Sequence, residues 1–247
     1  MLSLTVLGCS GSYASASEAC SGYLVQTETT SIWVDCGPGT LSAIQRWIDP
    51  TRLDAIVVSH QHPDHCAELP VFYNALKWYL GGKRMPVYAA SGVFEVSAVH
   101  VPDLTDVFDW TVIDATSQVR IGDVDVSFDR TDHTVETLAC RFDSDGRSIV
   151  YTSDTGPGWD PSGLAADADV LLGDATVLHD QVHDGLPHMS ARQLAEAATR
   201  ARVGELVLTH LAPGSDPAAF MQEATEHFGG PIGCASGGVV VVAGRHV

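Results

Sequence analysis

The distribution of apolar and polar positions along the chain predicts many short strands interleaved with helices. Short apolar stretches bounded by Gly and Ser are typical of strands, whereas residues 53–59 form a continuous apolar run. Such a run indicates a central strand that is covered on both faces. Further strands are expected at residues 4–7, 22–27, 31–35, 86–89, 111–113, 123–129, 137–142, 147–152, 170–172, 205–209 and 238–243.

The helix expected at residues 191–202 has the clearest boundaries, with Ser190 as N-cap, Gln193 at the capping-box position and Gly204 after its end. Because strands in both halves are followed by helices, we expect two packed sheets, each covered outside by helices. Ligands would then bind to loops along one edge of the sandwich. The other predicted helices span residues 40–48, 66–79, 93–100 and 216–228.

Length and composition indicate one folded domain over residues 1–247, because 45% of the residues are hydrophobic. No stretch approaches the ~18–20 uncharged apolar residues of a membrane helix. The first residues lack a basic segment, so we expect no signal peptide. The six cysteines form no C-x-x-C pair and are predicted to be reduced thiols, which places the protein in the cytoplasm.

The charge balance bears on the kind of ligand. Thirteen Lys and Arg face 31 Asp and Glu, which gives a net charge of −18, and the basic residues are scattered. Proteins that grip the backbone of a nucleic acid usually carry a basic stripe. The sequence therefore argues against a polyanionic partner but leaves room for a small anionic substrate at a cationic metal site.

The segment that follows the predicted central strand carries the strongest chemical signal. Here His60, His62, Asp64 and His65 form an H-x-H-x-D-H pattern. His60 and His62 can point to the same side of an extended backbone, while Asp64 and His65 can reach a neighbouring point. This geometry suits two ions, with Zn²⁺, Mn²⁺ or Fe²⁺ matching the imidazole and carboxylate groups. The alternative is a polar surface loop that is rich in histidine.

Three more candidates stand at the C-terminal ends of predicted strands. His133 follows the strand at 123–129, Asp154 follows the strand at 147–152, and His210 ends the strand at 205–209. A single residue so placed is more often a hydrogen-bonded loop residue. Three similar cases favour a common role as ligands, because loops at one sheet edge can aim several side chains at one point.

Taken together, these motifs resemble the metallo-β-lactamase superfamily over nearly the whole chain. Residues 151–156 and 187–190 resemble the branch of RNase Z and its relatives, and most closely the short class II-like cyclic-nucleotide phosphodiesterases. The resemblance implies an α/β fold, a four-layer αββα sandwich. It also implies that one metal is bound by His60, His62 and His133, the second by Asp64, His65 and His210, with Asp154 bridging the two.

His188 lies two residues before the Ser190 that begins a helix, as in the RNase Z group. The resemblance places this histidine beside the scissile phosphate and pairs it with a carboxylate, which is usually Glu. The matching residue here is Asp174, whose shorter side chain leaves the contact open. We expect Asp64 to orient the attacking water and His188 either to act as general acid or to stabilise charge on the phosphoryl oxygens. Asp174 would fix the tautomer of His188. The alternative for His188 is a surface residue at a helix start.

The sequence supports a phosphodiesterase that acts on a small substrate such as a 3′,5′-cyclic nucleotide. RNase Z enzymes, which process the 3′ end of tRNA, bind it through a flexible arm in this interval, whereas here His133 and Asp154 are only 21 positions apart and a predicted hairpin fills the space. A carboxylic ester, lactone or β-lactam hydrolase is a further alternative. A di-metal redox or sensor protein is the non-enzymatic one, although such relatives usually carry a flavin domain. Homodimers are common among the similar proteins, and the sequence indicates no interface.

Overall fold

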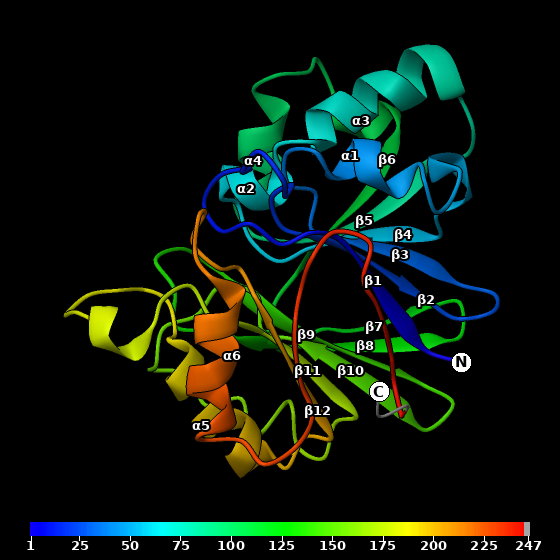
Figure 1. Cartoon of the computed structure of the whole chain (residues 1–247). Coiled ribbons are helices and arrows are strands. Elements are labelled where there is room, and N and C mark those ends of the chain that lie inside the picture. The colour runs from blue at the N-terminus through cyan, green and yellow to red at the C-terminus, as the bar shows by residue number, and fades with distance from the viewer. Residues whose placement is uncertain (245–247) are drawn as a thin grey trace.

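The strand expected at residues 53–59 lies inside the first sheet, between β3 and β5. The computed structural model describes residues 1–244, and within them this sheet has seven strands in the order β14-β1-β2-β3-β4-β5-β6 (Figure 1). The strands β3 to β6 run parallel, and the pairs on the other side are antiparallel. The bounds are β1 (Ser3–Gly8), β2 (Gly22–Gln26), β3 (Ser31–Val34), β4 (Ala55–Val58), β5 (Met85–Ala90), β6 (Phe108–Ile113) and β14 (Val240–Val242).

The second sheet is also mixed. Among the described residues it has seven strands in the order β13-β12-β11-β10-β9-β8-β7. Strands β10 to β13 are parallel, whereas β7 to β10 form antiparallel hairpins. The bounds are β7 (Gln118–Ile121), β8 (Val124–Arg130), β9 (Leu138–Ser144), β10 (Arg147–Tyr151), β11 (Val170–Asp174), β12 (Glu205–Thr209) and β13 (Ile232–Cys234).

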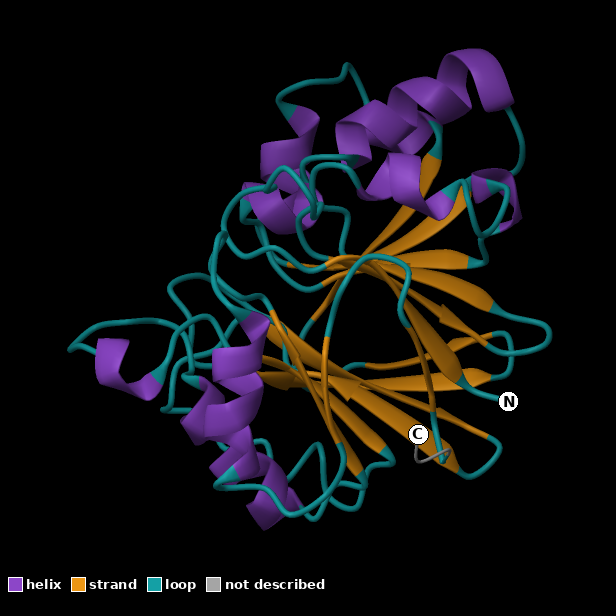
Figure 2. Cartoon of the chain, in the orientation of Figure 1, coloured by secondary structure: helices purple, strands orange, loops and turns teal. Residues whose placement is uncertain are grey.

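Helices lie on the outer face of both sheets (Figure 2). The first sheet is covered by α1 (Thr40–Ile44), α2 (Pro63–Cys66), α3 (Leu69–Ala75) and α4 (Val93–Ala98), and the second by α5 (Ala191–Ala201) and α6 (Pro217–Thr225). The predicted αββα sandwich is therefore confirmed. None of the helices in residues 1–244 is long and apolar enough to cross a membrane. Short helical turns complete the structure: η1 (Pro50–Arg52), η2 (Leu76–Leu80), η3 (Leu104–Asp106) and η4 (His179–Gln181).

Aromatic side chains join the layers. Tyr23 of β2 and Tyr151 of β10 meet between the sheets, with ring centroids 4.9 Å apart. The Tyr23 hydroxyl also lies 2.7 Å from Thr209 Oγ1 at the end of β12. On the outer side of the first sheet, Trp33 packs edge-on against Phe72 of α3. The buried contacts of Tyr23 fix the two sheets relative to each other close to the ends of β10 and β12, and the contact of Trp33 holds α3 on the first sheet.

The segment predicted as one helix over residues 66–79 is divided. Helix α2 ends at Cys66, α3 begins at Leu69, and a π-turn at Leu76–Leu80 precedes Gly81. Pro70 explains the break, because its nitrogen has no hydrogen to donate and its ring would clash with the carbonyl group of Cys66. Helix α2 begins at Pro63, before the predicted start at residue 66, so Asp64 lies in its first turn.

Two strands were not predicted, and both lie at sheet edges. β7 has the sequence QVRI, and β13 has the sequence IGC. Edge strands have fewer buried positions and often carry polar residues, so their apolar signal is weak. The structure also shortens the helix expected at 40–48 to Thr40–Ile44 and the one at 216–228 to Pro217–Thr225, and it extends the strand expected at 111–113 to Phe108–Ile113.

Candidate metal centre

Loops at one edge of the sandwich bring all seven predicted metal-binding residues together. The loop after β4 supplies His60 and His62, and helix α2, which follows it, supplies Asp64 and His65. The loops after β8, β10 and β12 supply His133, Asp154 and His210. Most of these side chains are buried, although the strands that carry them belong to different sheets. Asp132, next to His133, stays outside the cluster, where its carboxylate accepts a hydrogen bond from Gly158 N.

The first group consists of His60, His62, His133 and Asp154. His62 Nδ1 lies 3.1 Å from both His60 Nε2 and His133 Nε2. Asp154 Oδ2 lies 3.6 Å from His60 Nε2 and 3.7 Å from His133 Nε2. Four potential ligand atoms therefore surround one point.

The second group consists of Asp64, His65, His210 and, again, Asp154. His65 Nε2 lies 3.3 Å from His210 Nε2, 3.5 Å from Asp64 Oδ2 and 3.2 Å from Asp154 Oδ1. His210 Nε2 lies 3.4 Å from Asp64 Oδ2 and 3.3 Å from Asp154 Oδ1. The two carboxylate oxygens of Asp154 thus face different groups.

These separations are those of ligands around metal ions. Four ligands at about 2.0–2.2 Å from a tetrahedral ion lie about 3.3–3.6 Å from one another. Asp154 Oδ1 is buried and has no hydrogen-bond partner among the described residues, although buried carboxylate oxygens normally have one. A cation between the donor atoms would satisfy this oxygen. The cluster is therefore compatible with a dinuclear metal site.

Asp35 holds the imidazole of His65 on the side away from the other ligands, and the sequence did not predict this role. Its Oδ2 lies 2.7 Å from His65 Nδ1 and accepts hydrogen bonds from the hydroxyl groups of Ser59 and Tyr151. Its Oδ1 accepts the backbone N–H of Ser59. Like Asp154, Asp35 follows a buried strand, and that placement was the signal that could have identified it.

The other imidazoles are held in the same manner by their second nitrogen. His133 Nδ1 lies 3.0 Å from the carbonyl oxygen of Pro187, and His210 Nδ1 lies 3.0 Å from Thr176 Oγ1. Ser12 donates its backbone N–H to Asp64 Oδ2 at 2.9 Å. Partners of this kind fix ring orientation and tautomer at metal centres. Pro187, Thr176 and Ser12 were not predicted, because backbone and hydroxyl partners leave no pattern in the sequence.

Three residues at the cluster adopt left-handed backbone conformations. The φ angles are +55° at Asp35, +54° at Ser153 and +60° at His210. Such values are uncommon outside glycine and raise the energy of the backbone by about 1–3 kcal/mol each. Gly11 allows the close approach of the neighbouring loop, since a Cβ there would lie 2.7 Å from the His210 carbonyl oxygen. Backbone strain is therefore present where the side chains converge, and Ser12, with φ +62°, adds to it beside Asp64.

His188 contacts Asp174 in spite of the shorter carboxylate. His188 Nδ1 lies 2.8 Å from Asp174 Oδ2, and the Asp174 side chain is fully buried. Thr155 N donates to the same oxygen, while Thr176 donates through both its backbone N–H and its hydroxyl to Asp174 Oδ1. The imidazole of His188 stacks on His210 at 5.2 Å between centroids. His188 therefore lies against the second group, with its side chain 14% exposed.

Burial and neighbouring charges raise the pKa of some side chains at the cluster and lower that of others. Burial would lower the pKa of His188, but the Asp174 carboxylate outweighs it and raises that pKa to about 9. Burial would raise the pKa of Asp64, but hydrogen bonds with His210 and His65 hold it below its usual range. Burial and the neighbouring imidazole of His65 hold the pKa of His60 well below its usual value. His60 is therefore neutral and Asp64 ionised, as metal ligands must be.

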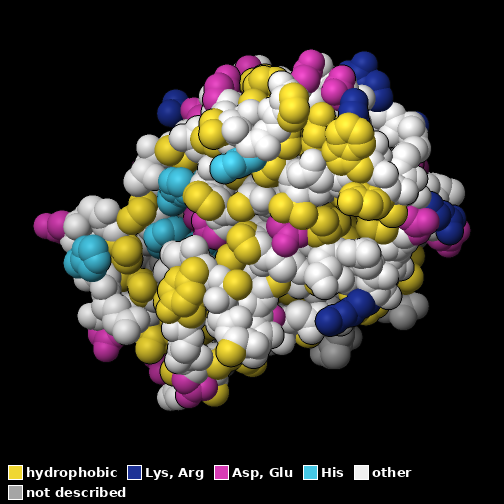
Figure 3. All heavy atoms as spheres, turned by 90° about the horizontal axis from the view of Figure 1, so that it is seen from above, with side chains coloured by type: hydrophobic (Ala, Val, Ile, Leu, Met, Phe, Trp, Pro, Cys, Tyr) yellow, Lys and Arg dark blue, Asp and Glu magenta, His cyan; other side chains and the backbone are white. Residues whose placement is uncertain are grey.

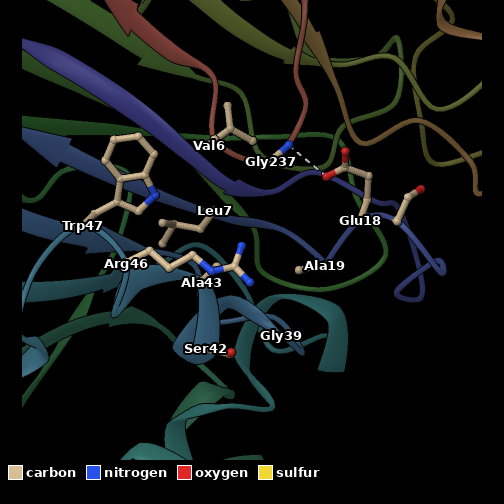
Figure 4. Close-up of a pocket in the computed structure, with 12 residues that line it drawn as sticks. Val6, Leu7, Glu18, Ala19, Gly39, Ser42, Ala43, Arg46, Trp47 and Gly237 are labelled. Atoms are coloured by element: carbon tan, nitrogen blue, oxygen red, sulfur yellow. Dashed lines mark hydrogen bonds between the residues drawn. The ribbon is translucent and has the colours of Figure 1, made fainter.

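The surface around the cluster is poor in basic groups. Figure 3 shows histidine side chains gathered on one side of the face, with apolar, uncharged and acidic side chains around them, while Lys and Arg side chains form no stripe. A separate hollow with a volume of about 360 Å³ lies beside Arg46, Trp47 and Glu18 (Figure 4). Glu18 is already hydrogen-bonded to Ser236 and Gly237. This hollow shares no residue with the cluster.

The comparison with protein families identifies the fold. The model of the β-lactamase superfamily domain matches residues 30–211, which include all seven clustered residues. The chain belongs to the β-lactamase superfamily. The family model and the relatives described below identify the chain as a metallo-hydrolase of the metallo-β-lactamase fold.

The relatives match nearly the whole chain. The probable metallo-hydrolase YhfI of Bacillus subtilis is 30% identical over 248 residues, covering 97% of this chain and 99% of that protein. Its crystal structure matches with a TM-score of 0.89 at 29% identity, over 97% and 98% of the two chains. Ribonuclease Z of Methanopyrus kandleri is 27% identical over 263 residues, covering 92% and 93%. A diphosphatase of the PhnP family shares the fold, with a TM-score of 0.75, 18% identity and 98% coverage of both chains.

Proposed function

We propose that this metallo-hydrolase is a dinuclear phosphodiesterase that hydrolyses a small phosphodiester, a 3′,5′-cyclic nucleotide. The observation that carries the proposal is the position of His188. Its imidazole stacks against the second group of clustered residues and is held by a buried carboxylate. A cationic hydrogen-bond donor at this place suits the negative charge of a phosphodiester and its leaving oxygen.

The ions would be two divalent metals, with Zn²⁺ as our first choice and Mn²⁺ or Fe²⁺ as alternatives. His60, His62 and His133 would hold one, Asp64, His65 and His210 the other, and Asp154 would bridge them. When bound, such ions supply Lewis acidity toward phosphoryl oxygens and a water nucleophile at neutral pH. The chemistry of the donor set, imidazole nitrogens and carboxylate oxygens, suits all three metals.

Asp64 would orient the attacking water. Its Oδ2 is occupied by Ser12 N and faces His65 and His210. Within residues 1–244 the hydrogen bonds and ion pairs of Asp64 all use Oδ2, so the second oxygen, Oδ1, can accept a hydrogen bond from water. Because hydrogen bonds hold its pKa below the usual range, Asp64 is an acceptor at all physiological pH values.

His188 would deliver the proton that the leaving group needs. Its Nδ1 faces Asp174, so that its Nε2 carries the proton available to substrate. The water oxygen would form a bond to phosphorus and release one proton to solvent, while the bond between phosphorus and the 3′-oxygen breaks and the Nε2 proton passes to that oxygen. Solvent then reprotonates the ring, and the product is a 5′-nucleotide. Asp174 fixes the tautomer and stabilises the imidazolium.

Two features favour a small substrate over tRNA. The hairpin of β9 and β10, joined by a turn at Asp145 and Gly146, occupies most of the interval between His133 and Asp154. The net charge of −18 also disfavours a polyanion. The six cysteines are free thiols, and all but Cys234 are buried, which supports a reducing compartment such as the cytoplasm.

The decisive experiment is a substrate screen with metal analysis of the same sample. Protein with bound metal is incubated with 3′,5′-cyclic AMP, bis-p-nitrophenyl phosphate, a tRNA precursor and an aliphatic lactone. We expect turnover of the first two substrates, with 5′-AMP as the product from the cyclic nucleotide. Turnover of the lactone or the tRNA precursor alone would reject the proposal in favour of that alternative. A metal-loaded protein that hydrolyses no phosphodiester would reject it outright.

A further inference from the structure

A second hollow borders the metal loop itself. It lies between that loop, α2 and α4 and has a volume of about 240 Å³. We call it the loop–α4 pocket, and the lining residues that matter here are Gln61, Pro63, Cys66, Val96, Ser97 and His100. Gln61 and Pro63 are the chain neighbours of His62. Because consecutive Cα atoms are about 3.8 Å apart, two residues of the pocket wall lie directly beside this predicted metal ligand.

One buried polar group in this pocket lacks a partner. Ser97 of α4 is 3% exposed, and its hydroxyl oxygen has no hydrogen-bond partner among the described residues. A buried hydroxyl without a partner is unfavourable by about 1–3 kcal/mol. Because Ser97 lines the pocket, a ligand there could supply the missing partner.

The rest of the lining indicates what the ligand would be. Most of the lining is apolar, with Cys66 buried at the side of α2 and Val96 at the rim, where it is 38% exposed. The amide of Gln61 and the exposed imidazole of His100 are the other polar groups of the lining. A volume of 240 Å³ lies below the about 300–1,000 Å³ of sites that enclose a whole drug-sized ligand. The pocket therefore suits one flat ring of a ligand whose other part is bound elsewhere.

We propose that the loop–α4 pocket binds the heteroaromatic base of the phosphodiester whose phosphate is held at the metal centre. A nucleobase has two apolar faces for the walls and an edge of donors and acceptors for Ser97 and His100. This inference rests on the proposed function for its substrate class. It assigns base recognition to α4, outside the metal-binding loops.

The test measures binding, so that it does not depend on turnover. The affinities of metal-loaded protein for 5′-AMP and for ribose 5-phosphate are compared by titration calorimetry. Burial of the base should make 5′-AMP bind about tenfold or more tightly than ribose 5-phosphate. Equal affinities in the wild type would overturn the proposal.

Substitutions then test whether the preference for 5′-AMP comes from the loop–α4 pocket. Val96→Trp fills the pocket from its exposed rim and should reduce the preference for 5′-AMP to about threefold or less. Val99→Trp is the matched control, because Val99 is 78% exposed and does not line the pocket. Ser97→Ala should weaken 5′-AMP binding by about three- to tenfold and leave ribose 5-phosphate unchanged.

The outcomes separate this proposal from the proposed function. An equal effect of Val96→Trp and Val99→Trp would refute the base pocket, and an unchanged affinity in Ser97→Ala would refute the hydroxyl contact. If the expected binding pattern is found but no cyclic nucleotide is hydrolysed, the proposed function fails and the pocket assignment stands. If cyclic AMP is hydrolysed without any preference for 5′-AMP, the pocket assignment alone fails.

Discussion

At the scale of single residues, the pair of Asp174 and His188 shows how backbone placement compensates for side-chain length. Asp174 is the last residue of β11, and the isolated bridge between Val177 and Ser190 draws the segment that carries His188 toward that strand end. The contact therefore forms at 2.8 Å although the carboxylate is one methylene shorter than Glu. Sequence alone left this contact open, because side-chain length says nothing about where the neighbouring backbone lies.

Asp174→Asn tests how this carboxylate controls proton transfer. The pKa of His188 is raised to about 9 in the metal-free fold, so the ring is cationic below that value and loses its proton as the pH rises through it. Without the charge of Asp174, we expect the pKa to fall toward about 6.5. An NMR titration of His188 in metal-free protein measures the shift directly.

The same variant should lower kcat about 10- to 100-fold at pH 7.5 with both metals retained. The control is Asp167→Asn, which removes an exposed ion pair with Arg202 far from the cluster. A titration curve of His188 that is identical in wild type and Asp174→Asn would contradict the assigned role of the carboxylate.

His62→Ala separates ligands from the general acid. His62 Nδ1 lies 3.1 Å from two other imidazole nitrogens, so its loss removes one donor from the first group. We expect loss of at least one metal per chain by elemental analysis, together with loss of activity. His188→Ala should instead keep both metals and lower kcat about 100-fold or more. His183→Ala, in an exposed loop, is the control. Full metal content in His62→Ala would exclude His62 as a ligand.

At the scale of elements, the sequence predicted those that combine an apolar run with a clear boundary. The strand at 53–59 and the helix at 191–202 are examples, the latter with the predicted capping box between Ser190 and Gln193. The seven clustered residues were found because each follows a strand or lies in the H-x-H-x-D-H segment. The partners that orient them, such as Thr176 and the Pro187 carbonyl, come from segments distant in sequence. Their roles depend on tertiary packing, which no local pattern encodes.

Ser190→Ala tests the contribution of the capping box to α5. The Ser190 hydroxyl accepts the backbone N–H of Gln193, and the Gln193 side chain accepts that of Ser190. Removing this cap should lower the free energy of unfolding by about 1 kcal/mol. Urea denaturation followed by circular dichroism measures the change, and Ser190→Thr, which keeps a hydroxyl, should recover part of it. Equal stability of Ser190→Ala and the wild type would show that the cap is energetically neutral.

At the scale of the whole molecule, the cluster joins both sheets, so metal should stabilise the entire fold. Ions that bind only the folded state at about 1,000 times their Kd add about 4 kcal/mol. For a chain of this length such a change corresponds to roughly 10 °C in Tm. We therefore expect a chelator to lower the Tm by that amount in a calorimetric scan.

Asp154→Asn should show a smaller shift with chelator, because the remaining amide cannot bridge two cations as a carboxylate does. Asp160→Asn, an exposed carboxylate paired with Arg200, is the control and should behave as the wild type. An unchanged Tm of wild-type protein after complete removal of metal would contradict a structural link between the cluster and the two sheets.

The distribution of charge over the molecule predicts weak binding of tRNA. Nine of the Lys and Arg side chains in residues 1–244 form ion pairs with acidic groups, which leaves Arg46, Arg52 and Lys83 without an acidic partner in that part of the chain. Non-specific binding to nucleic acids comes from neutralising phosphates and typically gives Kd values of about 10⁻⁴–10⁻⁶ M. With so few free cations, we expect a Kd for tRNA weaker than about 10⁻⁴ M at physiological salt. Fluorescence anisotropy of labelled tRNA over a salt series checks this, and micromolar binding that weakens steeply with salt would restore tRNA as the substrate.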